Sequence, residues 1–141
     1  MQKKKTKIHQ FDPVIFSIKL WITVNPDFNQ LKKMFRDRGT GKALDFENLM
    51  NTKSAITAAV IENSTDFFGV LIVFKNYKSL TCKFIAHEAT HAAGFIFNHI
   101  DEQVEASEPF AYLLGWISDC CWQIKTNSKN KIEHETEKIQ N

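Results

Sequence analysis

The chain has 141 residues, 43% of them hydrophobic and 12% aromatic, which is enough to bury one core and excludes global disorder. Its formal net charge of +2 is too close to neutral to indicate nucleic acid as a partner. Three cysteines exclude an all-cysteine zinc site and fit a reducing compartment. No segment reaches the roughly 20 apolar residues of a membrane span and no export signal is recognisable, so we expect a soluble protein.

The first third of the chain predicts an arm, a strand and a helix. Residues 1–10 are basic and polar, which indicates a loose N-terminal arm. Residues 14–24 alternate between apolar and polar side chains, which is typical of a half-buried strand. Asn25-Pro26-Asp27 ends that strand, and apolar residues at helical spacing predict a helix over 28–36.

The middle of the chain predicts a β-hairpin followed by helices. Two β-branched runs, 55–61 and 69–74, flank the turn-forming residues 63–66. A helix is expected from about Leu80 to Ile100, and a second helix from about Ser107, which can cap it. From residue 126 to 141 the chain is polar, either an exposed helical extension or a frayed tail.

These elements predict one α+β domain over residues 1–141. Its expected architecture is a small antiparallel sheet of about three strands, followed by a packed pair of helices. Because the link between the two helices is short, they should pack antiparallel.

The first of these helices carries the motif Ala86-His87-Glu88-Ala89-Thr90-His91. Histidines four residues apart lie one turn apart on one face, where a single metal ion can reach both. Glu88 is about 100° around the helix from His87, where its carboxylate could deprotonate a water at the metal without being a ligand. The motif therefore predicts a zinc site with Glu88 as general base.

The charge of this region supports the same hypothesis. Between Lys83 and Lys125 the chain has no Lys or Arg but six acidic residues. From Phe84 to Ile100 the only formally charged side chain is Glu88, on a helix that is apolar nearly all round. A buried carboxylate is costly unless it is paired. A metal ion with its water would satisfy it, as would a partner from elsewhere in the fold.

A catalytic zinc ion usually has three protein ligands, so a third must be found. His99 is too far along the helix, whereas several acids follow it. We expect Glu108, at the start of the second helix, to be the third ligand, with Glu105 as the alternative. Tyr112, one turn further, could hydrogen-bond a ligand or stabilise an oxyanion, or else be an aromatic core residue.

The motif, taken together with Glu108-Pro109-Phe110-Ala111-Tyr112-Leu113-Leu114-Gly115-Trp116, resembles a group of small HExxH proteins encoded by bacteriophages, prophages and related mobile elements. These are described as zinc metallopeptidases of the gluzincin type. The resemblance covers roughly residues 69–124 and implies a minimal zincin-like fold. It also implies His87, His91 and Glu108 as zinc ligands and Glu88 as general base. Tyr112 stands where larger gluzincins have an acid.

Two functions follow as hypotheses. The first is a zinc-dependent metallopeptidase whose partner is a peptide or protein substrate, with the strand edge at 69–74 aligning an extended peptide. The second is a zinc-stabilised phage, virion or interaction protein without turnover. An open metal position beside a cleft favours the enzyme, and a closed metal site favours the structural role. Neither a membrane nor nucleic acid is an expected partner, and the expected location is the bacterial cytoplasm or the virion.

Overall fold

The computed structural model describes residues 4–140, apart from the side chains of residues 132–134 and 140. Its elements in chain order are β1 (His9–Phe11), β2 (Lys19–Val24), α1 (Phe28–Met34), β3 (Phe35–Asp37), α2 (Phe46–Met50), β4 (Ala55–Glu62), β5 (Phe68–Phe74), the 3-10 turn η1 (Tyr77–Ser79), α3 (Cys82–His99) and α4 (Glu108–Gln140). Within this described part, no helix combines the length and the hydropathy needed to cross a membrane.

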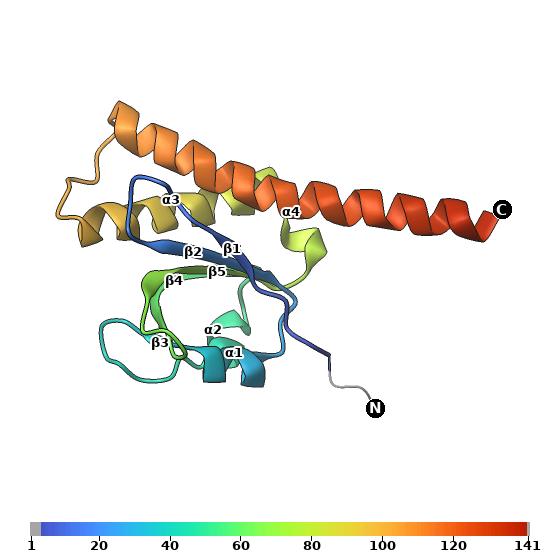
Figure 1. Ribbon diagram of the computed structural model, residues 1–141, viewed down its shortest axis with the longest axis horizontal. Helices are drawn as coiled ribbons and strands as arrows, with labels where there is room; N and C mark the ends of the chain where they lie inside the picture. Colours follow the sequence, from blue (N-terminus) through green and yellow to red (C-terminus); the bar gives the residue numbers. More distant parts are fainter. Residues whose placement is uncertain (1–3, 141) are drawn as a thin grey trace.

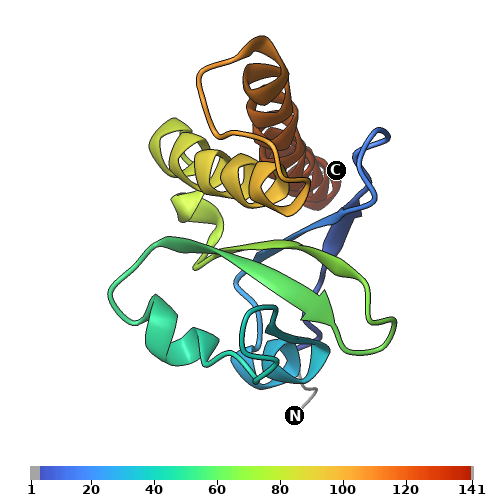
Figure 2. The ribbon, with the colours of Figure 1, turned by 90° about the vertical axis from the view of Figure 1, so that its left-hand side faces the viewer.

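The strands form one sheet in the order β1-β2-β5-β4-β3, with helices against both of its faces. β2 and β5 run parallel, and the other neighbours are antiparallel. Figures 1 and 2 show α3 and α4 on one side of the sheet and the short helices α1 and α2 on the other. Alternate residues of each strand therefore face two separate apolar cores, one under α3 and α4 and one under α1 and α2.

The predicted fold class was wrong in its architecture. The predicted hairpin is present as β4 and β5, but the sheet has five strands and is mixed, rather than three antiparallel strands. The parallel pairing of β2 with β5 joins segments about fifty residues apart, and no local pattern reports such a contact. The three-residue strands β1 and β3 are too short to show an alternation.

The predicted basic arm is also shorter than expected. His9–Phe11 form β1 along β2, and Thr6 before them is buried. The Thr6 backbone N–H donates to Gln30 Oε1 at 2.8 Å, and Asp27 N–H donates to Thr6 Oγ1 at 2.8 Å. These bonds fix the start of the described chain against α1.

Helix α4 packs antiparallel along α3 and extends well past it (Figure 1). The Phe97 and Phe110 rings, 5.2 Å apart, set the register at one end of α3. At its other end, Lys125 Nζ donates to the carbonyl of Leu80 at 2.6 Å. The start of α4 therefore lies beside the end of α3, and the part of α4 after Lys125 projects beyond the domain.

Gly69 in β5 is required by the close approach of β2. A Cβ at this position would overlap both the backbone carbonyl of Lys19 and the indole ring of Trp21. Trp21 is buried, and its ring packs at 5.1 Å from that of Phe35 in the core under α1 and α2. A side chain at residue 69 would thus force the parallel β2–β5 pair apart.

We predict that Gly69→Ala lowers the free energy of unfolding by about 1–3 kcal/mol or more, the usual cost of overpacking a core. Gly115→Ala is the control, because nothing lies within 4 Å of a Cβ there and alanine favours the helix over glycine by about 1 kcal/mol. Urea denaturation followed by circular dichroism measures both. Equal stability of the two variants would show that β2 and β5 are not in this contact.

Candidate metal site

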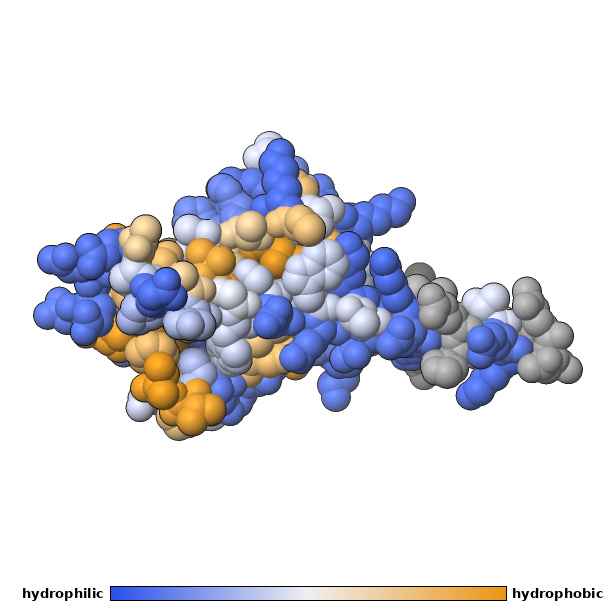
Figure 3. All heavy atoms as spheres, turned by 90° about the horizontal axis from the view of Figure 1, so that it is seen from above, coloured by the Kyte–Doolittle hydropathy of each residue, from blue (hydrophilic) through white to orange (hydrophobic). Residues whose placement is uncertain are grey.

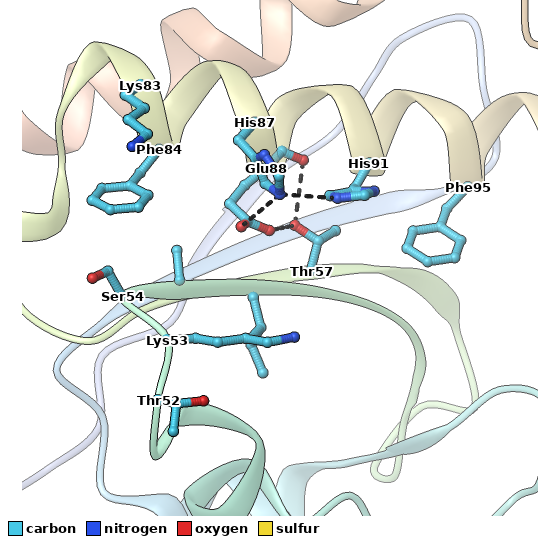
Figure 4. Close-up of a pocket in the computed structure, with 12 residues that line it drawn as sticks. Thr52, Lys53, Ser54, Thr57, Lys83, Phe84, His87, Glu88, His91 and Phe95 are labelled. Atoms are coloured by element: carbon cyan, nitrogen blue, oxygen red, sulfur yellow. Dashed lines mark hydrogen bonds and ion pairs between the residues drawn. The ribbon is translucent and has the colours of Figure 1, made fainter.

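The residues of the HExxH motif lie on α3, whose first turn is capped by Thr81. Its Oγ1 accepts from Phe84 N–H at 3.3 Å. Spacing of four residues places His87 and His91 on one exposed face of the helix, while Ile85, Ala89 and Ile96 are buried. Figure 4 shows the two imidazoles side by side above β4. The motif is therefore helical, as predicted, and its histidines reach solvent.

The two imidazoles converge. His87 Nε2 and His91 Nε2 are 3.2 Å apart, with the rings nearly perpendicular at 73°. Two nitrogens bound to one tetrahedral zinc ion at 2.0–2.1 Å lie about 3.3 Å from each other. The same separation also permits a hydrogen bond between one protonated and one unprotonated nitrogen. The pair thus has the spacing of two ligands of one zinc ion.

Glu88 is buried beside this pair, with 4% of its surface exposed. Its Oε2 accepts a hydrogen bond of 2.5 Å from Thr57 Oγ1 on β4, and its Oε1 lies 4.0 Å from His87 Nε2. That distance is longer than the roughly 3.4 Å between two ligand atoms of a tetrahedral zinc ion. The carboxylate therefore sits next to the histidine pair, as the motif predicts, rather than within its coordination sphere.

The imidazole pair and Glu88 open onto a groove of about 640 Å³ between α3 and β4. One wall is the exposed face of α3 from Lys83 to Phe95, and the other is the segment 52–57, which leads into β4. The His87 side chain is 64% exposed, and Figure 4 shows it pointing toward this groove. An ion bound by the two histidines would keep its remaining positions accessible to water or a ligand.

Glu108 and Tyr112 are not brought to the imidazole pair. They line a separate apolar cavity of about 530 Å³, together with Val14 and Ile15 at the tip of the β1–β2 loop. Figure 3 views the molecule from the side of α4 and shows apolar side chains gathered at the left end, where this helix begins. Tyr112 is 75% exposed, so neither its predicted site role nor its core alternative is observed.

The antiparallel register explains why Glu108 is distant. The start of α4 is held beside Phe97, six residues after His91 and about 9 Å further along the helix axis. Glu108 precedes Phe110 and lies further out still. Glu105, the alternative ligand, is exposed in the α3–α4 connection, near the same end.

Among the described residues, no three His, Cys, Asp or Glu side chains are grouped closely enough to hold one ion. The cysteines do not complete the site. Burial raises the pKa of Cys121 to about 12, with smaller contributions from Cys120 and Glu88, and burial raises that of Cys120 to about 12 as well. Both side chains are neutral thiols at physiological pH and poor metal ligands.

One residue of the candidate site, Thr57, is not identified by the sequence alone. The sequence predicts Thr57 only as part of a strand, whereas in the structure its hydroxyl donates a hydrogen bond to the Glu88 carboxylate. The sequence does show a hydroxyl side chain within the apolar run 55–61, on the same face of the predicted strand as Ala55. Its partner was not visible, since the hydrogen bond joins residues 31 positions apart.

Comparisons of the chain with protein-family models, with curated proteins and with solved structures found no match.

We predict that the purified protein binds one zinc ion per chain and that His91→Ala raises the Kd by at least about a hundredfold. Loss of residues that merely support a ligand already costs 10- to 100-fold. Glu108→Ala is the matched control and should leave the Kd unchanged, because its carboxylate lies at the other end of α3. Isothermal titration calorimetry distinguishes the variants. Loss of zinc in Glu108→Ala would restore Glu108 as a ligand and contradict this geometry.

We also predict that Thr57→Val destabilises the metal-free protein by about 1–3 kcal/mol, the cost of leaving a buried polar group without its hydrogen bond. Thr57→Ser, which keeps the hydroxyl, should retain most of that stability. Thermal unfolding by calorimetry measures both. If valine and serine gave the same loss, the methyl packing of Thr57 would matter more than its bond to Glu88.

Proposed function

We propose that the protein is a zinc-dependent hydrolase that cleaves peptide bonds in the groove between α3 and β4. The observation that carries the proposal is the 3.2 Å separation of the His87 and His91 Nε2 atoms, with a buried carboxylate at 4.0 Å. Imidazole nitrogen suits zinc, and the pair would supply two of the three protein ligands that a catalytic zinc ion usually has, with water or substrate in the remaining positions.

The residues divide the chemistry between them. When bound, zinc would act as a Lewis acid that lowers the pKa of a water toward about 7. Glu88 Oε1, which faces His87, is free to take a proton, because the Thr57 hydroxyl occupies Oε2. Thr57 thereby orients the carboxylate as a base. The proton can afterwards pass to the leaving amine.

An open strand edge next to the imidazoles supports a peptide as substrate. Lys75 N–H donates to the Ser54 carbonyl, and Glu62 N–H donates to the Phe67 carbonyl. The backbone N–H and C=O groups of the even-numbered residues of β4 therefore bond to β5, and those of the odd-numbered residues point away from β5, toward the outer edge of the strand. Within the described chain, the outward backbone groups of Ala55 and Thr57 have no partner. An extended peptide could pair with them by strand addition.

This edge replaces the one expected from the sequence. The segment 69–74 lies in β5, which is bonded to β2 on one side and to β4 on the other. It therefore has no free edge along most of its length. β4 is the strand that borders the groove.

The alternative function, a zinc-stabilised protein without turnover, is less well supported. Structural zinc sites are closed by four protein ligands. Here the described residues offer two histidines, both exposed on a groove. Openness of this kind was the feature expected of an enzyme.

The test is Glu88→Gln, which keeps the shape of the side chain but removes the base. We expect the variant to bind zinc with unchanged stoichiometry and to lose about 10²- to 10⁴-fold in kcat, the contribution of general base catalysis. Zinc-loaded protein and a pool of internally quenched peptides provide the assay, with Glu108→Gln as the control. Equal turnover by wild type and Glu88→Gln would reject the mechanism.

A further inference from the structure

Two lysines line the groove, one on each wall. Lys83 is on α3, one turn before His87, and Lys53 is in the segment before β4. Figure 4 shows Lys83 at one end of the helix wall, whereas the Lys53 side chain lies along the β4 wall with its ammonium group directed toward the middle of the groove, below Thr57. Both side chains are exposed, so their ammonium groups can reach a bound ligand.

Neither ammonium group has an acidic partner in the described part of the chain. Lys83 lies over the Phe84 ring at 5.8 Å, and Lys53 makes no ion pair. Among the described residues, the only acid that lines the groove is Glu88, which is buried and bonded to Thr57. The accessible charge on the groove walls is therefore positive.

The strand edge directs a bound peptide past these lysines. β3 pairs with β4 over Val60–Glu62, and Arg38 N–H donates to the Ala59 carbonyl at 3.1 Å. The edge is thus closed from Ala59 onward and open only at Thr57 and Ala55. β3 blocks strand pairing beyond Ala59, so a peptide that pairs with the open part extends along residues 52–54, on the groove walls that carry Lys53 and Lys83.

We propose that the groove selects peptides that carry acidic residues where they pass Lys53 and Lys83. The inference rests on the proposed function in that it assumes a peptide in this groove. Carboxylates of such a peptide would meet two unpaired cations, whereas a basic peptide would be repelled. Lys53 and Lys83 are specificity-determining residues in this proposal and take no part in the chemistry.

The experiment measures binding separately from turnover. Three fluorescein-labelled peptides share one apolar centre and carry paired Glu, Gln or Lys residues on both flanks. Their Kd values for zinc-loaded Glu88→Gln protein are measured by fluorescence anisotropy, and their cleavage by zinc-loaded wild type is followed by mass spectrometry. The same binding series is repeated with Lys53→Glu/Lys83→Glu, and with Lys129→Glu/Lys131→Glu as a control of equal charge change on the exposed end of α4.

We expect the Glu peptide to bind about tenfold more tightly than the Lys peptide, a preference that weakens at high salt. The groove variant should reverse the order, and the control should keep it. Equal Kd values for the three peptides, an unchanged order in the groove variant, or no binding of any peptide overturns the inference. Selective binding without cleavage upholds it and rejects the proposed function, whereas cleavage without charge preference does the opposite.

Discussion

The burial of the Glu88 carboxylate is the constraint on which the site depends. A charged group with 4% of its surface exposed is costly unless its oxygens are satisfied. Thr57 satisfies one of them at 2.5 Å, and this bond joins α3 to β4 on the same side as the buried apolar face of the helix. With Glu88 turned inward, His87 and His91 must lie on the flank of the helix, facing the groove rather than α4. The pairing of the two imidazoles follows from their four-residue spacing, and the orientation of the helix makes them face the groove.

The sheet supplies the second half of the site. Because β5 is bonded on both sides, it occupies the inner edge of β4 and leaves the outer edge of β4 for a ligand. The short strand β3 covers the far part of that edge, so the open backbone groups lie opposite the histidines. The proposed peptide binding and its charge preference both depend on this partial closure.

Helix α4 packs against α3 but does not supply the third zinc ligand that its sequence predicts. It covers the apolar face of α3, and its antiparallel register carries Glu108 to the end of α3 far from the imidazoles. Two adjacent helices connected by a short link were predictable from periodicity and charge. The direction in which the polar residues of each helix point could not be predicted, because it depends on how both helices pack on the sheet.

The local sequence determined the helix of the HExxH motif, the β4–β5 hairpin, the histidine pair on one face and the inward position of Glu88. All of these depend on residues within one or two turns or across one tight turn, where spacing dictates geometry. Only the tertiary structure decided the mixed sheet, the Thr57 bond to Glu88, the open edge of β4 and the displacement of Glu108. Those features join segments some 20 to 50 residues apart, and their free energy comes from packing and desolvation that no single segment encodes.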